Sequence, residues 1–114
     1  MISVQRFLNT KTQQLAYFVR AYWNKRILYQ ELDLYFWDTM EEWSQVSQGQ
    51  GQGKNQPCSQ RERVFWYLLH QLHFWPEHSL LNDPVLRCDL DLCVTYLECQ
   101  KKYPFSPDYI GARP

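Results

Sequence analysis

The sequence is poor in the features that mark several large classes of protein. Lysine and arginine together number 12, as do aspartate and glutamate, so the 114-residue chain has no net charge to attract nucleic acid or an anionic membrane. Only four glycines and six prolines interrupt it, and no apolar run approaches the ~20 residues of a membrane span. At 45% hydrophobic residues, it is too apolar for wholesale disorder. We therefore expect one globular domain over residues 1–114.

Motifs that indicate a known chemistry are also missing. The chain has no C-x-x-C pair, no glycine-rich phosphate or dinucleotide motif and no nucleophile elbow. We therefore expect a non-enzymatic protein without a cofactor. The first residues lack the apolar stretch of a secretory signal, which favours the cytoplasm, where thiols stay reduced. The expected free thiols, packed as small buried apolar groups, are Cys58, Cys88, Cys93 and Cys99.

Apolar residues recur at helical spacing in four segments, which predicts an all-α fold. The predicted helices span approximately residues 10–25, 29–47, 60–75 and 84–102. Each of three helix starts carries a capping signal: Thr10 with Gln13, Ser59 with Glu62, and Asp83 before Pro84. Residues 3–8 fit a preceding helical turn, and residues 77–82 fit a connector with at most one turn.

The join between the first two helices has no strong helix breaker. Residues 24–26 contain neither glycine nor proline, so the pattern permits either a helical hairpin or one helix over residues 10–47. We favour the hairpin, because a monomer cannot bury both apolar faces of such a long rod, although a dimer could. Four helices in two hairpins then form a bundle-like core.

Two segments do not fit a helix. Residues 48–58 contain three of the four glycines and no large apolar side chain, which is typical of a flexible Gly/Gln linker. Residues 103–114 contain three prolines, so we expect them to form an extended tail. The apolar groups of the tail either wrap their own domain or dock on another chain.

Zero net charge conceals two opposed segments. Residues 1–28 contain five bases and no acid, whereas residues 29–47 contain five acids and no base. We favour a structural interpretation, in which the two helices pair antiparallel and their flanks attract. The alternative is a nucleic-acid surface formed by Arg20, Lys25 and Arg26 with nearby rings. We disfavour it because the patch is thin and the adjacent acidic helix repels phosphate.

The chain contains nineteen aromatic residues, more than four helical stripes accommodate. Adjacent helix positions differ by ~100°, so in pairs such as Phe36-Trp37 one ring must leave the core. Interfaces are enriched in such rings, so we predict a protein-interaction module, as a homodimer or with another partner. A covering tail and linker, or a small-molecule groove, are the alternatives. The candidate interaction residues are Trp37, Trp66, Tyr67, Trp75, Phe105 and Tyr109.

Two histidines are the only weak sign of a metal site. His70 and His73 are three apart on a predicted helix and can face one ion. The sequence does not show acidic or thiol ligands beside them. We therefore expect two boundary histidines and regard a metal-dependent activity as the third alternative.

Overall fold

The structure is a computed structural model, and it describes residues 3–49, 59–99 and 103–104. This part of the chain is 86% helical and has no strands, which confirms the predicted all-α, bundle-like fold. The five helices are α1 (Val4–Trp23), α2 (Tyr29–Gly49), α3 (Gln60–Phe74), α4 (Glu77–Asn82) and α5 (Pro84–Cys99).

The first helix begins earlier than predicted. Ser3 is its N-cap, and the Ser3 hydroxyl accepts a hydrogen bond from the Arg6 amide at 3.1 Å. Thr10 therefore lies inside the helix, and the prediction of a start at residue 10 is wrong. The reason is that Val4, Phe7 and Leu8 are buried and extend the apolar face of the helix without a break.

The turn between α1 and α2 is a Schellman motif. The Arg26 amide donates to the Ala21 carbonyl at 2.8 Å, and the Lys25 amide donates to the Tyr22 carbonyl at 3.0 Å. Lys25 has a φ of 61°, the left-handed conformation that the motif requires. The predicted hairpin is therefore confirmed, and the single long helix is wrong. Glycine, the usual signal for this turn, is absent.

Two other predicted caps are present. The Ser59 hydroxyl accepts from the Glu62 amide at 3.1 Å and begins α3. An Asp83 carboxylate oxygen accepts from the amides of Val85 and Leu86 at 3.0 and 3.1 Å, which begins α5 at Pro84.

The predicted connector over residues 77–82 is a complete helix, α4, so the structure has five helices in the described residues rather than four. Helix α3 ends at Phe74, one residue before the predicted end, because Trp75 is extended ahead of Pro76. The described part of α5 ends at Cys99, and residues 100–102 of its prediction lie outside the described part.

The predicted linker and tail fall largely outside the described residues. Residues 48 and 49 continue α2, and residues 50–58 are not described. Of the tail only Tyr103 and Pro104 are described, and the Tyr103 ring lies 5.7 Å from the Tyr96 ring. Phe105 and Tyr109 lie outside the described part, so their predicted role remains untested.

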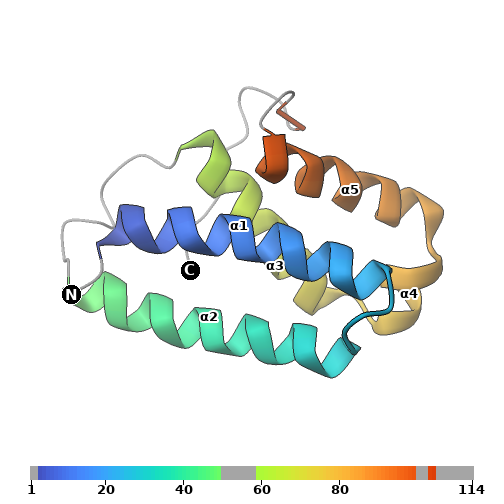
Figure 1. Cartoon of the computed structure of the whole chain (residues 1–114), viewed down its shortest axis with the longest axis horizontal. Helices are drawn as coiled ribbons and strands as arrows, with labels where there is room; N and C mark the ends of the chain where they lie inside the picture. Colours follow the sequence, from blue (N-terminus) through green and yellow to red (C-terminus); the bar gives the residue numbers. More distant parts are fainter. Residues whose placement is uncertain (1–2, 50–58, 100–102, 105–114) are drawn as a thin grey trace.

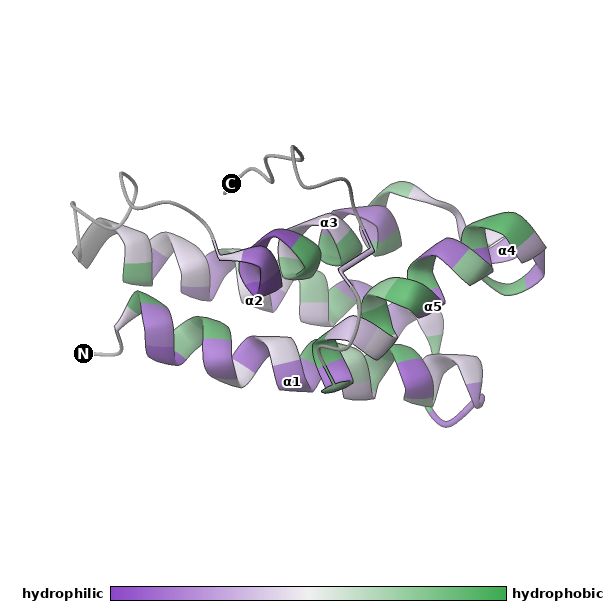
Figure 2. Ribbon diagram, turned by 90° about the horizontal axis from the view of Figure 1, so that it is seen from above, coloured by the Kyte–Doolittle hydropathy of each residue, from purple (hydrophilic) through white to green (hydrophobic). Residues whose placement is uncertain are grey.

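Helix α1 lies between α2 and α5, with α3 behind it (Figure 1). Green apolar bands alternate with purple polar bands along the helices, as amphipathic helices in one bundle require (Figure 2). One hydrophobic cluster joins the five helices. Its fully buried members include Leu15, Val19, Phe65, Leu68, Leu80, Leu90 and Val94.

We predict that Lys25→Gly stabilises the protein. A residue with a β-carbon pays about 1 kcal/mol to adopt the left-handed conformation, whereas glycine adopts it freely. The free energy of unfolding in urea should rise by about 0.5–1 kcal/mol, after the extra entropy of unfolded glycine is subtracted. Lys25→Ala is the matched control, and an equal gain from alanine would contradict this account of the turn.

Candidate interaction surface

The adjacent rings of α2 separate as their spacing predicts. Phe36 is 6% exposed and packs in the core, whereas Trp37 is 54% exposed. Because the two positions differ by ~100° around the helix, α2 cannot bury both rings against α1 and α3. Trp37 is thus a large apolar side chain at the surface.

A histidine of α3 holds these two rings in place. The His73 ring stacks on Phe36, with ring centroids 4.0 Å apart and planes at 3°. The Trp37 ring meets the same imidazole edge to face at 5.2 Å and 83°. His73 Nδ1 lies 3.4 Å from a carboxylate oxygen of Asp33. Trp37 is therefore exposed but fixed by packing.

Two more exposed apolar side chains lie next to this cluster in the chain. Leu34 precedes Trp37 by three residues on α2 and is 60% exposed, and Phe74 follows His73 and is 70% exposed. Residues three apart on a helix are neighbours, so Leu34 and Trp37 form one apolar patch. We call Leu34, Trp37, His73 and Phe74 the α2–α3 surface. Leu34 is absent from the residues predicted from the sequence, because that prediction considers only aromatic side chains as candidates for the interaction surface.

The other predicted anchor rings in the described residues, Trp66, Tyr67 and Trp75, already have contacts within the fold. Trp66 is 1% exposed, and its Nε1 donates to a buried carboxylate oxygen of Glu62 at 3.1 Å, so it is a core residue. Tyr67 is half-buried, and its hydroxyl donates to Asp89 at 2.7 Å. Trp75 is also half-buried and donates to the Gln71 amide oxygen at 2.7 Å.

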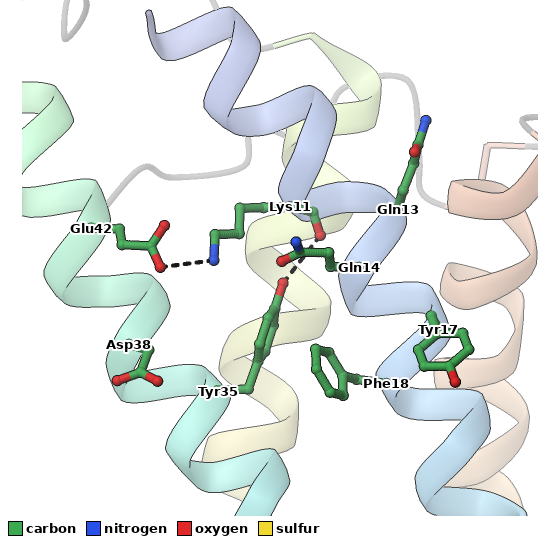
Figure 3. Close-up of a pocket in the computed structure, with 8 residues that line it drawn as sticks. All are labelled: Lys11, Gln13, Gln14, Tyr17, Phe18, Tyr35, Asp38 and Glu42. Carbon is green, nitrogen blue, oxygen red and sulfur yellow. Dashed lines mark hydrogen bonds and ion pairs between the residues drawn. The ribbon is translucent and has the colours of Figure 1, made fainter. Parts of the chain in front are cut away.

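A groove of about 460 Å³ lies between α1 and α2. The rings of Phe18 and Tyr35 lie next to each other in it, with centroids 4.6 Å apart and planes tilted by 44° (Figure 3). Lys11 reaches across to Glu42 with an Nζ–Oε1 distance of 3.0 Å, and its ammonium lies 5.2 Å from the centre of the Tyr35 ring. The full lining is Lys11, Gln13, Gln14, Tyr17, Phe18, Tyr35, Asp38 and Glu42.

The Tyr35 hydroxyl joins the two helices that form this groove. It donates to the carbonyl of Lys11, another lining residue, at 3.2 Å. Burial raises the pKa of Tyr35 above its ordinary value, and the nearby Glu42 carboxylate adds to the effect. Tyr35 therefore remains a neutral phenol, and its ring presents an uncharged aromatic face.

Two basic residues of α1 form ion pairs with two different helices, α2 and α5. Lys11 pairs with α2, as the structural interpretation predicts. Arg20 instead reaches α5: its guanidinium pairs with Asp91, and its Nη2 lies 3.1 Å from both Thr95 Oγ1 and Glu98 Oε1. Arg20 is thus already engaged with two carboxylates, which weakens the proposed contact with phosphate.

The two other candidates for nucleic-acid contact lie at the turn after α1. Lys25 and Arg26 are both exposed, and neither forms an ion pair with a residue that the structure describes. Two cations at one turn, beside an arginine that already has partners, form a smaller positive patch than the sequence suggested.

The histidines lie beside rings and backbone. His70 Nδ1 is 2.7 Å from the Trp66 carbonyl oxygen, four residues earlier on α3, and His73 stacks on Phe36. Nowhere in the described ranges do three or more His, Cys, Asp or Glu side chains gather as metal ligands. Asp33 lies beside His73, but in the described residues it does not form a group of metal ligands with the two histidines.

A second exposed apolar feature runs along α5. Val85 is 78% and Leu92 52% exposed, and Cys88 and Cys99 are also exposed. These four residues lie at spacings of three, four and seven, which is the pattern of one coiled-coil seam. We call them the α5 crest. The prediction that the cysteines are buried is wrong for Cys88 and Cys99 and correct for Cys93, and Cys58 lies outside the described residues.

In comparisons with protein families, with curated proteins and with solved structures, the chain has no significant match. None of the helices in the described residues is both long enough and apolar enough to cross a bilayer.

We predict that the cysteines differ sharply in reactivity toward Ellman's reagent. Burial, and secondarily the charge of Asp89, raises the pKa of the Cys93 thiol to about 12, so it stays protonated and unreactive at pH 8. In a Cys58→Ser background, Cys88 and Cys99 should react in the native protein and Cys93 only after denaturation. Labelling of Cys93 as fast as the exposed thiols would contradict the packing of α5.

Proposed function

We propose that this protein is a non-enzymatic protein-interaction module that binds a partner through the α2–α3 surface. The observation that carries the proposal is Trp37, which is 54% exposed and yet held by the His73 ring. Tryptophan is among the residues most enriched at energetic hot spots of interfaces. A side chain that is already ordered loses less entropy on binding than a mobile one.

The apolar part of the surface is large enough to matter energetically. Fully burying a large apolar side chain contributes about 1.5–3 kcal/mol. Leu34 and Trp37 are each more than half exposed and lie three residues apart on α2, so a partner that covers both gains two such contributions. Scattered single apolar residues are common on proteins, whereas a fixed aromatic patch favours a binding role.

The charges around Trp37 favour a basic partner. Helix α2 carries five acids and no base: Glu31, Asp33, Asp38, Glu41 and Glu42. A second copy that met this face symmetrically would place like charges opposite each other, which disfavours binding. A partner with lysine or arginine around an apolar centre is complementary instead.

Photo-crosslinking in cells that naturally express the protein tests this proposal. With benzoylphenylalanine in place of Leu34, we expect a protein adduct of defined mass that disappears when Trp37→Ala is added. The same probe in place of Gln5, an exposed polar residue of α1, should not give that adduct.

Val85→Ala is the control variant, because it truncates an exposed apolar side chain on another helix and should leave the adduct unchanged. Adducts that are the same at both probe positions, or that persist without Trp37, would contradict the proposal.

Self-association through the α5 crest is a second candidate. Two of the acids that flank the crest, Asp91 and Glu98, are paired with Arg20. A second copy can therefore approach α5 with less repulsion than at α2.

We also place the protein in the cytoplasm, where exposed thiols such as Cys88 stay reduced.

Sedimentation velocity tests the dimer. We expect a monomer–dimer equilibrium that shifts to monomer in Leu92→Glu, because the charge would be desolvated at the seam. Leu34→Glu adds the same charge on the α2–α3 surface and should leave the equilibrium unchanged. A strict monomer at every concentration, or equal loss in both variants, would rule out the crest as the contact.

A further inference from the structure

The α2–α3 surface contains a side chain whose charge can change near neutral pH. His73 stacks on Phe36, with ring centroids 4.0 Å apart, and its Nδ1 lies 3.4 Å from a carboxylate oxygen of Asp33. The side chains of His73 and Asp33 are 38% and 40% exposed, so protons and ions from the solvent reach both. Carboxylates in proteins ordinarily stay ionised between about pH 5 and 8, whereas histidine changes its charge in that interval. The pair can therefore change from a neutral contact to an ion pair.

Asp33 also lies where a base of the partner would meet the apolar part of the surface. It directly precedes Leu34 and comes one helical turn before Trp37 on α2. The Trp37 ring lies 5.2 Å from the His73 ring, so Asp33 and Trp37 both contact the same imidazole. A partner with a base beside its apolar centre, as the charge of α2 favours, therefore finds an acceptor at Asp33.

We propose that Asp33 pairs with a lysine or arginine of the partner, and that protonated His73 competes for the same carboxylate, so that acid weakens partner binding. With a neutral imidazole, the Nδ1–oxygen distance of 3.4 Å is longer than the about 2.7–2.9 Å of a charge-assisted hydrogen bond, which leaves the carboxylate available to a stronger donor. A positive imidazole pairs with Asp33 and also places a positive charge beside Trp37, which repels a basic partner. The inference rests on the proposed function, since the partner supplies the base, and it names the regulation of that site.

The packing of His73 accommodates a positive charge without moving the exposed tryptophan. His73 lies in the last turn of α3, at the negative end of the helix dipole. Its ring is parallel to the Phe36 ring to within 3°, and aromatic faces attract cations. The stack on Phe36 needs no charge, so Trp37 remains held in both states. What protonation changes is the charge beside Trp37.

The other titratable groups around His73 come from α3 and α4. On α3, His70 contacts the same phenyl ring at a centroid distance of 6.0 Å. From α4, Glu77 acts together with Asp33 on Tyr29: burial first, and then these two charges, raise the pKa of Tyr29. In the described ranges, no acid or base of α1 or α5 forms an ion pair with His73.

Unfolding in urea tests the internal ion pair without the partner. Asp33→Asn should lower the urea midpoint at about pH 5.5 and have a much smaller effect at about pH 8, because the pair exists only while His73 is protonated and is lost as the pH rises. In a His73→Phe background, which keeps a ring on Phe36 but removes the charge, Asp33→Asn should have the same effect at both pH values. Glu41→Gln removes an exposed acid from the same helix and is the matched control, with the same effect at both pH values. An Asp33→Asn effect that does not depend on pH when His73 is present would overturn the inference.

Photo-crosslinking at two pH values tests the competition with the partner. In lysate of cells that naturally express the protein, the adduct formed by benzoylphenylalanine in place of Leu34 should fall about threefold between about pH 8 and about pH 5.5, as expected for the loss of one partly exposed ion pair. His73→Phe should keep the adduct at its higher level at both pH values. His70→Gln, which removes an exposed histidine from the same helix, is the matched control and should retain the decrease.

Asp33→Asn should lower the adduct at about pH 8 to the level that the unsubstituted protein shows at about pH 5.5. An equal decrease with acid in the unsubstituted protein and in His73→Phe would overturn the inference and leave the proposed function standing. Absence of the adduct at both pH values would contradict the proposed function itself.

Discussion

The burial of α1 on three sides is the constraint on which the rest of the structure depends. Leu15 and Val19 are completely buried because α2, α3 and α5 all pack against this one helix. A helix that is covered on three sides leaves its neighbours to bear the outer surface. Helices α2 and α5 each pack one face on α1 and keep another face in solvent, and the exposed apolar side chains of both helices lie on those outer faces.

The basic residues of α1 stabilise this arrangement from both flanks. Lys11 pairs with α2 and Arg20 pairs with α5, so these two bases contact two different neighbours rather than one. Each exposed pair contributes little, about 0–1 kcal/mol. Their larger effect is on the charges that remain unpaired. Because Arg20 is used by α5, the acids of α2 keep an excess of negative charge, and that excess gives the proposed binding face its chemical character.

Much of the fold follows from sequence spacing, and much of the candidate site does not. The spacing of apolar residues identified four of the helices, and the caps at Ser59 and Asp83 lie where their side chains predict. The turn at Lys25 was chosen by a burial argument, because no glycine marks it. Spacing also showed that Phe36 and Trp37 cannot both be buried. It could not show that Trp66 enters the core, since that depends on how α3 packs on α2, where the Trp43 ring lies 5.1 Å from the Trp66 ring.

The sequence by itself determined the helical class, the capped starts of α3 and α5, the opposed charges of the first two helices and a surplus of aromatic rings. These are local properties, because helix periodicity and capping depend on residues a few positions apart. Only the tertiary structure decided which acids Arg20 binds and which aromatic rings remain exposed. Those contacts join residues of separate helices, and their distances depend on how the helices pack.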